Sequence, residues 1–241
     1  MDGNDNQPRK CRLLGRAGSR GPRLGHVHPA SGQSGSRRGT GLVALGSLKI
    51  SVVLGSVSRP GRLHAAVSWL LTEAEGAFPQ ATADLIDLHT LSVSFADGRP
   101  LDQYSDDTQS VVERVQAADG VLLATPIYHS AYSGALKNVL DLLPVEALQG
   151  KPVAMLGLGA TTAYYQALES QLRPVLTWFG ALTLPVGGYL AQDQFTDGQL
   201  SDEEGRSDLL ALYGGLVGLC QVTADDGPSL GLEPLTIRRR R

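Results

Sequence analysis

Apolar runs and helical patterns alternate along most of this chain. Five short apolar runs have the composition of buried strands and cover residues 49–54, 81–87, 120–124, 152–156 and 182–186. Apolar residues at spacings of three and four predict amphipathic helices between and after them, over residues 62–75, 107–118, 136–143, 164–179 and 202–220. Within the fourth helix we expect an interruption only at Pro174. Residues 92–106 follow neither pattern and predict a long loop.

This alternation predicts the fold class. Strands that are joined by crossover helices form a parallel sheet with helices on both faces, as in α/β proteins. We therefore expect a flavodoxin-like, doubly wound sheet of five parallel strands in the order 2-1-3-4-5. Residues 48–222 are long enough to fold as one such domain.

The two ends of the chain differ from the predicted domain in charge. Residues 1–47 hold eight arginine or lysine residues against two aspartates, a net charge of +6, and are rich in Gly, Ser and Pro. Such a segment has too few apolar side chains to offset the entropy lost on ordering, so we expect a disordered basic tail. A flexible C-terminal tail, residues 223–241, ends in four arginines. Because the whole chain carries −3, residues 48–237 carry −13.

Charge and composition exclude several classes of partner. An acidic domain lacks the positive surface that duplex nucleic acid requires, which argues against nucleic acid as the main partner. No stretch approaches the ~20 apolar residues of a membrane span. The two cysteines, Cys11 and Cys220, form no paired motif. We expect a cytoplasmic protein with no membrane partner.

The loop after the first strand has the features of an anion site. Residues 55–62 read GSVSRPGR and lie between a strand and the start of a helix. Free backbone N–H groups and the positive end of the helix dipole favour a phosphate there. Ser56 and Ser58 add hydroxyls and Arg62 adds a charge. The loop lacks the lysine of a P-loop and the spacing of GxGxxG, so nucleoside triphosphate hydrolysis is not expected.

Two further loops follow predicted strands. The third strand stops at Thr125 and Pro126, and an aromatic stretch with Ile127 and Tyr128 comes next. The loop after the fourth strand contains Gly159 and Thr161. Ligands of open α/β sheets bind at the carboxyl ends of the strands, so these loops and the anion loop should line one site.

No catalytic acid–base pair and no metal site emerge from the sequence. His64 and His89 are isolated along the chain, and only His129 falls in a predicted site loop. No serine stands in a GxSxG motif. A site with phosphate donors, aromatic residues and backbone suits a cofactor that performs its own chemistry, and FMN fits: one phosphate for the first loop and a planar ring for the other two.

Residues 117–149, AADGVLLATPIYHSAYSGALKNVLDLLPVEALQ, closely resemble the NADPH-dependent FMN reductases that serve two-component alkanesulfonate monooxygenases. The resemblance implies that residues 125–128 (Thr125, Pro126, Ile127 and Tyr128) position the flavin ring. It further implies that Tyr132, Ser133 and Gly134 form a helix distortion, a π-bulge at Tyr132, and part of a subunit interface. We therefore expect a homodimer or homotetramer.

The same resemblance locates the phosphate ligands and two departures from the family pattern. In the motif GSxRxxS, Ser58 stands where the family has arginine and Gly61 where it has serine. Arg62 matches an arginine of the sulfonate-linked subgroup, which implies that it is the phosphate ligand in preference to Arg59. The family's TGGT loop keeps one glycine, Gly159, and the threonine, Thr161. Weaker retention of FMN is the expected consequence.

The function expected from these features is transfer of a hydride from NADPH, or from NADH, to FMN. Reduced FMN would then pass to a flavin-dependent monooxygenase of the alkanesulfonate type. Two alternatives stay open at this point. The protein could hold FMN permanently and reduce quinones, azo dyes or chromate, or it could be a flavodoxin-like electron carrier without turnover.

Overall fold

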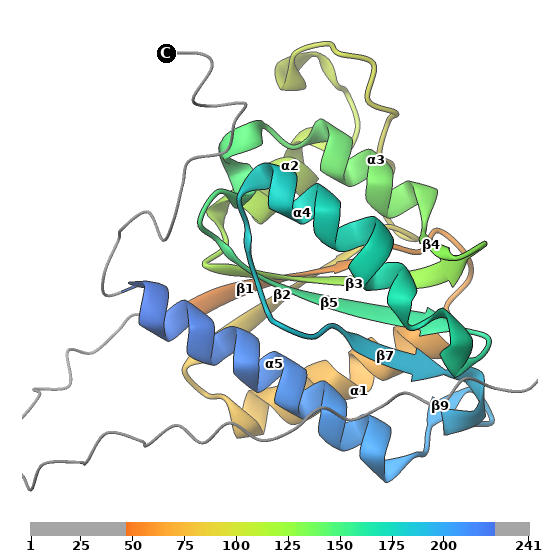
Figure 1. Ribbon diagram of the computed structural model, residues 1–241. Coiled ribbons are helices and arrows are strands. Elements are labelled where there is room, and N and C mark those ends of the chain that lie inside the picture. The colour runs from red at the N-terminus through yellow and green to blue at the C-terminus, as the bar shows by residue number, and fades with distance from the viewer. Residues whose placement is uncertain (1–46, 225–241) are drawn as a thin grey trace, which may run out of the picture. The chain divides into compact units, whose positions relative to one another are not determined.

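The computed structural model describes residues 47–224, which form a layered α/β domain. A mostly parallel sheet lies in the middle, with α1 (Arg62–Ala77) and α5 (Glu203–Ala224) on one face. The other face is covered by α2 (Thr108–Ala117), α3 (Gly134–Leu142) and α4 (Arg173–Phe179) (Figure 1). The predicted fold class, with helices on both faces, is confirmed.

The strands are β1 (Leu48–Leu54), β2 (Ala81–Asp87), β3 (Gly120–Tyr128), β4 (Ala131–Tyr132), β5 (Pro152–Gly159), β6 (Leu182–Thr183), β7 (Gly188–Ala191), β8 (Phe195–Thr196) and β9 (Gln199–Leu200). Short 3-10 helices cover Leu101–Gln103, Val145–Leu148, Thr162–Tyr164 and Gln192–Gln194, and a π-helix covers Leu168–Leu172. The sheet order is β2-β1-β3-β5-β6, with β7 also paired to β5 and the short β4 paired to β3. Counted by the predicted strands, this is the order 2-1-3-4-5.

The sequence pattern explains the two layers of the core. β1 and β3 are buried on both faces, because helices cover both sides of the sheet, and each therefore reads as a continuous apolar run. On α1 the buried residues recur at helical spacing and face the sheet: Leu63, Ala66, Val67, Leu70 and Ala74. The other positions of α1 are partly or fully exposed.

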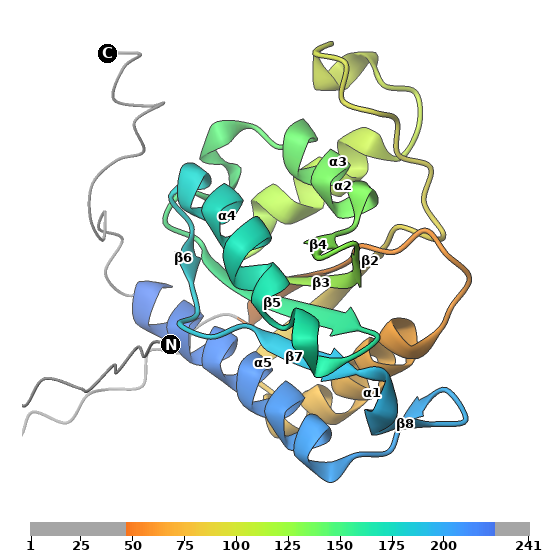
Figure 2. The same cartoon turned by 45° about the vertical axis from the view of Figure 1, so that its right-hand side comes forward.

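The prediction of a fifth strand over residues 182–186 is wrong in its extent: β6 covers only its first two residues, and the separate strand β7 begins at Gly188 (Figure 2). Both pair with β5, but residues 184–187 leave the sheet between them. Side chains of the preceding helix satisfy the backbone in this break: Arg173 donates to the carbonyls of Leu184 and Pro185, and Glu169 accepts from the Gly187 N–H. The helix itself is interrupted by the π-helix at 168–172, whereas Pro174 lies in the first turn of α4, where proline is tolerated.

The prediction that the third strand stops at Pro126 is wrong. β3 continues to Tyr128, and Pro126 still pairs with Leu158 of β5. The Ala124 carbonyl accepts from the Gly55 N–H on the β1 side. Along a strand, the backbone polar groups of every second residue point to the same side. The N–H that Pro126 lacks would therefore point toward β1, as the Ala124 carbonyl does. β1 has ended at Leu54, and the missing donor therefore costs no ladder bond.

The two predicted tails lie outside the described residues, except for Ser47 and the last two residues of α5, 223 and 224. α5 thus runs slightly beyond the predicted domain end at 222. Among the helices described between residues 47 and 224, none is long and apolar enough to cross a membrane.

Candidate functional site

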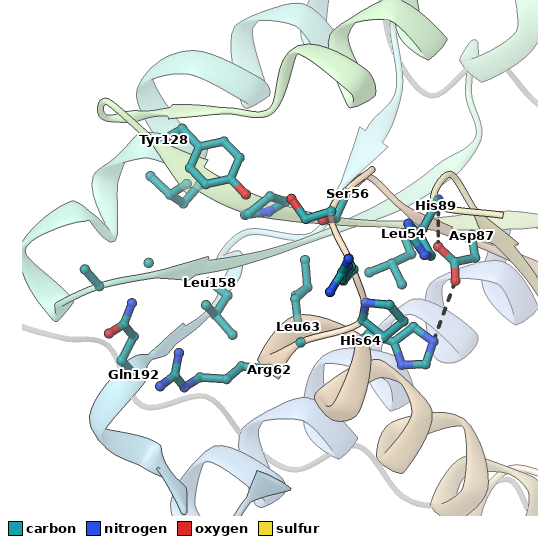
Figure 3. Close-up of a pocket in the computed structure, with 18 residues that line it drawn as sticks. Leu54, Ser56, Arg62, Leu63, His64, Asp87, His89, Tyr128, Leu158 and Gln192 are labelled. Atoms are coloured by element: carbon teal, nitrogen blue, oxygen red, sulfur yellow. Dashed lines mark hydrogen bonds and ion pairs between the residues drawn. The ribbon is translucent and has the colours of Figure 1, made fainter. Parts of the chain in front are cut away.

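A cavity of about 330 Å³ opens at the carboxyl ends of the central strands (Figure 3). Its walls come from the three loops that the sequence singled out, together with the end of β2. The lining residues are Leu54, Ser56, Ser58, Arg59, Pro60, Gly61, Arg62, Leu63, His64, Asp87, His89, Pro126, Ile127, Tyr128, Leu158, Gly159, Ala160 and Gln192. Of the predicted cofactor-binding residues, the structure therefore brings together all except Thr125 and Thr161.

One end of the cavity is built to receive an anion. α1 begins at Arg62 behind Gly61, and no side chain caps the first N–H groups of the helix. These groups lack partners inside any helix and carry the positive end of its dipole. Arg59 and Arg62 line the same end, and neither has a carboxylate partner among the described residues. The donor set matches a phosphate group.

Two histidines and an aspartate gather at this end, although the sequence suggested that the histidines are isolated. Asp87 ends β2, beside Leu54 of β1, and is only 9 % exposed. Its carboxylate lies 3.6 Å from Nε2 of His64 and accepts from the backbone N–H of His89 at 3.0 Å. The ring of His89 turns away to the Val57 carbonyl, 3.1 Å from Nδ1. Pairing of β1 with β2 produces this cluster.

The charged groups occupy two sides of the cavity. In Figure 3, Arg62 and Gln192 lie on one side, His64, Asp87 and His89 lie on the other, and Leu63 stands between them. An anion at the start of α1 therefore has a guanidinium on one flank and the histidine cluster on the other. The Asp87 carboxylate lies beside His64 on this second flank.

The other end of the cavity is mainly apolar and comes from β3 and β5. Pro126, Ile127 and Tyr128 supply one wall, and residues 158–160 supply the other. Tyr128 is 52 % exposed and stands at the rim. Peptide groups and apolar side chains on parallel strand ends can hold a planar ring.

A tight hairpin forms the rim beside Tyr128. Tyr128 pairs with Ala131 across a two-residue turn, His129 and Ser130, whose φ angles are 50° and 61°. Positive φ at both central positions is the conformation of a type I′ turn, which glycine and asparagine adopt more easily. The turn therefore holds a backbone conformation that its side chains disfavour, at the edge of the cavity.

Thr125 is a support for the site and does not line the cavity. It is fully buried, and its Oγ1 accepts from the Ser133 N–H at 3.0 Å and donates to the Pro126 carbonyl. Ser133 is the N-cap of α3, with Oγ accepting from the Leu136 N–H. The same hydroxyl donates to the Gly55 carbonyl. These bonds tie the anion loop to the rim hairpin.

The helix distortion predicted at Tyr132 is wrong. Tyr132 lies in β4, paired with Ile127, and α3 begins only at Gly134 behind the Ser133 cap. The capping bonds of Ser133 end the hairpin and start a regular helix, so no extra residue has to be accommodated there. The π-helix of this structure lies instead at 168–172, and β4 packs beside it. An interface role of residues 132–134 stays a prediction.

Thr161 does not line the cavity. It holds the side chain of Tyr189, which in turn packs against Gly159. Its hydroxyl accepts from the Ala163 N–H, and its carbonyl accepts from the Tyr189 hydroxyl at 2.8 Å. Burial raises the pKa of Tyr189, so this hydroxyl stays a donor. A Cβ on Gly159 would stand 2.0 Å from the Tyr189 oxygen, so only glycine fits against it.

Sequence reasoning did not select several lining residues, among them His64, Asp87, His89, Leu158 and Gln192. One signal could have found Asp87: it is a polar residue at the carboxyl end of a predicted strand next to the first strand. Within residues 47–224 no three His, Cys, Asp or Glu side chains form a group that could hold a metal ion. The arrangement can bind a phosphate at one end and a planar ring at the other.

Comparison with known proteins agrees with this geometry. Residues 48–196 match the family model for NADPH-dependent FMN reductase. A "NAD(P)H-dependent FAD/FMN reductase" of Geobacillus thermodenitrificans is 37% identical over 141 residues, 58% of this chain and 76% of the relative. The "NADH-dependent FMN reductase SfnF" of Pseudomonas fluorescens is 30% identical over 156 residues, 65% and 83% of the two chains.

A solved structure shows the same fold. The apo form of an NADH:FMN oxidoreductase, EMOB, superposes with a TM-score of 0.59 at 27% identity and covers 73% of this chain and 89% of that one. The family match spans more than half of the present sequence and includes all three loops of the cavity. The chain is therefore a member of the NADPH-dependent FMN reductase family, enzymes that use NAD(P)H and FMN.

Proposed function

We propose that the cavity binds FMN for reduction by NAD(P)H and that reduced FMN leaves for a flavin-dependent monooxygenase of the alkanesulfonate type. The observation that carries the site assignment is the anion end. An uncapped helix start and two arginines that have no carboxylate partner within residues 47–224 open into the same cavity as the rim hairpin. FMN has one phosphate and one planar ring, which match the two ends.

The residues of the anion end would bind and orient the cofactor. The first N–H groups of α1, the hydroxyls of Ser56 and Ser58, and the guanidinium of Arg62 would surround the phosphate. Arg59 lines the same cavity and would share this role. We expect Arg62 to contribute most, since it belongs to the helix start itself.

The residues of the ring end would hold the isoalloxazine plane. Pro126, Ile127 and Tyr128 on one side and Gly159 on the other would set its position through backbone and apolar contacts. When bound, FMN supplies the hydride-accepting chemistry. The protein contributes positioning, since holding two reactants at near-attack distance removes up to ~7–11 kcal/mol of the barrier in favourable cases. No acid or base is required of the chain.

Release of reduced flavin is supported by the composition of the anion loop. Ser58 and Gly61 replace an arginine and a serine of the family motif, and most of the loop is exposed. Fewer charged contacts give faster dissociation, which suits a flavin that is passed on. We place this exchange in the cytoplasm, where NAD(P)H is available.

We also propose that the chain assembles as a homodimer or homotetramer. Several large apolar side chains are exposed: Phe95 in the loop beside α3, Tyr164 and Tyr165 in the segment that follows β5, and Trp178 on α4. Exposed apolar side chains of this size are typical of protein interfaces. Size-exclusion chromatography with light scattering measures the mass directly.

An oxidation assay tests the proposed reaction. Purified protein, freed of flavin, is mixed with NADPH or NADH, with and without added FMN, and absorbance at 340 nm is followed. We expect turnover only with FMN, and stimulation of a sulfonate monooxygenase when one is added. Absence of FMN-dependent turnover with both nucleotides would disprove the proposal.

The two alternatives predict different results in the same preparation. An FMN-containing quinone, azo or chromate reductase would purify yellow and reduce those acceptors without added flavin. A flavodoxin-like carrier would react slowly with NAD(P)H and accumulate one-electron-reduced flavin. The flavin content after purification and the acceptor dependence of the rate therefore separate the three functions.

A further inference from the structure

His64 and Asp87 form a pair to which the proposed reaction gives no role. His64 is the third residue of α1, and Asp87 is the last residue of β2. Nε2 of His64 lies 3.6 Å from the Asp87 carboxylate (Figure 3), and its Nδ1 lies 3.4 Å from the hydroxyl of Ser68. Both members of the pair line the cavity at its anion end, on the flank opposite Arg62. The pair is therefore placed to act on an anion that binds at the start of α1.

Charged groups of both signs surround the His64 ring. The start of α1 is the positive end of the helix dipole, which disfavours a cation in the first turn, and the arginines of the same cavity act in the same direction. The Asp87 carboxylate favours the protonated ring. The charged or titratable side chains that line this cavity, or the neighbouring groove along α1, together with His64 are Arg59, Arg62, Asp87, His89 and Asp197. An anion bound at the helix start adds negative charge and shifts this balance toward the protonated ring.

We propose that His64 is a second residue that selects phosphate-bearing flavin, and that it does so by taking up a proton when FMN binds. The inference rests on the proposed function, because it takes the anion end as the phosphate site. With a neutral ring, the pair leaves the negative charge of Asp87 beside the phosphate, which repels it. With a protonated ring, the pair is neutral and the repulsion is removed. Phosphate binding and protonation of His64 therefore favour each other.

This coupling makes the affinity for FMN fall as pH rises. Histidine changes charge between about pH 5 and 8, so the effect lies near neutral pH. Riboflavin has the same ring system without a phosphate, and its affinity should not depend on His64. Because the His64 side chain is 34 % exposed, solvent screens its charge. We therefore expect an effect of about fivefold on affinity, the upper end of the range for solvent-exposed charge pairs.

Calorimetric titration of the flavin-free chain with FMN and with riboflavin, at pH 6.5 and pH 8.5, tests the inference. His64→Gln keeps a hydrogen-bonding side chain that carries no charge. Asp87→Asn keeps an acceptor for the His89 N–H and removes the carboxylate. His89→Gln is the matched control, because the His89 ring contacts the Val57 carbonyl instead of the Asp87 carboxylate.

The number of protons taken up is measured in the same four proteins. FMN is titrated at pH 7.5 in two buffers of different ionisation enthalpy, and the difference between the two binding enthalpies gives the proton count. Most of the FMN phosphate has already lost its second proton at this pH, and the remainder contributes equally to all four proteins.

The two variants of the pair should deviate from the parent at opposite ends of the pH range. We expect His64→Gln to bind FMN about fivefold more weakly at pH 6.5 and within about twofold of the parent at pH 8.5. Asp87→Asn should match the parent at pH 6.5 and bind FMN more tightly at pH 8.5. His64→Gln should abolish the proton uptake, Asp87→Asn should reduce it, and His89→Gln should keep it. Riboflavin affinity should be the same in all four proteins.

Three results would overturn the inference and leave the proposed function standing. The first is an unchanged proton uptake and pH profile for FMN in His64→Gln. The second is loss of the uptake in His89→Gln alone, which would assign the proton to His89. The third is an equal loss of FMN and riboflavin affinity in His64→Gln, which would show that His64 supports the cavity and not the phosphate. Absence of FMN binding in the parent would contradict the proposed function and the inference together.

Discussion

The hydroxyl of Ser133 donates a hydrogen bond to the backbone carbonyl of Gly55, 78 residues earlier in the chain. Gly55 opens the anion loop, and Ser133 starts α3 behind the rim hairpin. The bond therefore couples the two ends of the cavity. Because the same oxygen accepts from the Leu136 N–H and Ser133 is 5 % exposed, no water replaces it easily.

Replacing Ser133 by alanine should lower both stability and flavin affinity. The substitution removes an N-cap, which costs about 1 kcal/mol, and deprives a buried carbonyl of its donor, which costs about 1–3 kcal/mol. We expect urea unfolding to show a loss of about 2–4 kcal/mol. Ser110→Ala, at an exposed position of α2, is the control and should change the unfolding free energy by less than about 0.5 kcal/mol. Equal stability of the two variants would contradict this role of Ser133.

Replacing Arg62 by alanine should weaken binding of FMN but not of riboflavin. Arg62 lines the anion end, and a charge-assisted bond to phosphate contributes about 1.5–3 kcal/mol. We expect the FMN dissociation constant to rise about tenfold, measured by quenching of flavin fluorescence. Arg59→Ala is the matched variant and should have a smaller effect. Equal losses for FMN and riboflavin would show that Arg62 acts on something other than the phosphate.

Tyr132 should contribute to stability through packing and not through its hydroxyl. Its side chain is partly buried against the core under α2–α4, and burial raises its pKa. Truncating a fully buried aromatic side chain to alanine costs ~3–5 kcal/mol of stability, and truncating a half-buried one costs less. We therefore expect Tyr132→Ala to cost about 1–2 kcal/mol. Tyr132→Phe should stay within about 0.5 kcal/mol of the parent. A large effect of the phenylalanine variant would reveal a partner for the hydroxyl, such as a second subunit.

The rim turn should become more stable with glycine. Ser130 has φ 61°, in the left-handed region that glycine adopts without steric cost. We expect Ser130→Gly to raise the free energy of unfolding by about 0.5–1 kcal/mol. Ser105→Gly, at an exposed position without positive φ, should instead be neutral or destabilising. If Ser130→Gly also destabilised the protein, the positive φ would have another cause than the turn type.

Lys151 should make stability depend on pH above neutrality. Its ammonium donates to the Val115 and Gln116 carbonyls at the end of α2, but burial lowers the pKa of Lys151 to about 8. Between pH 8 and about 10.4 the unfolded chain holds a proton that the folded chain has lost, so stability rises with pH. The gain in unfolding free energy reaches about 2–4 kcal/mol above pH 10.4 and is absent below pH 8.

The measurement compares the parent with Lys151→Met. Cys220, whose pKa burial raises to about 12, acts in the opposite direction above pH 9, and the charge of Lys151 also acts on it, so the two proteins are compared between pH 8 and 9. The difference in unfolding free energy should therefore move in favour of the parent as pH rises from 8. Lys137→Met, which removes an exposed lysine, is the matched control for the loss of a lysine charge. A flat difference for Lys151→Met would refute the assignment.

Local pattern was enough to predict that strands and crossover helices alternate, where the first four strands of the sheet begin, and where the anion loop lies. A strand that is buried on both faces has to be apolar throughout, and a helix that packs on a sheet has to be apolar on one side. The phosphate features follow too, because Gly61 and Arg62 lie at a strand-to-helix junction whose electrostatics are local. The fold class and most of the cavity could therefore be predicted from sequence alone.

Tertiary structure decided what depends on register and on long-range contacts. Asp87 reaches His64 only because β1 and β2 pair with Leu54 opposite Asp87, and no spacing along the chain encodes that pairing. Pro126 continues β3 because its neighbour β1 has ended. The turn at His129 and Ser130 contains no glycine or asparagine, the residues that usually indicate such a turn. The sequence therefore predicts a helix distortion at residues where the folded chain has a hairpin and a helix cap. Neighbouring residues in the sequence determine which local conformation a segment prefers. These features depend instead on contacts between distant segments, which only the folded chain brings together.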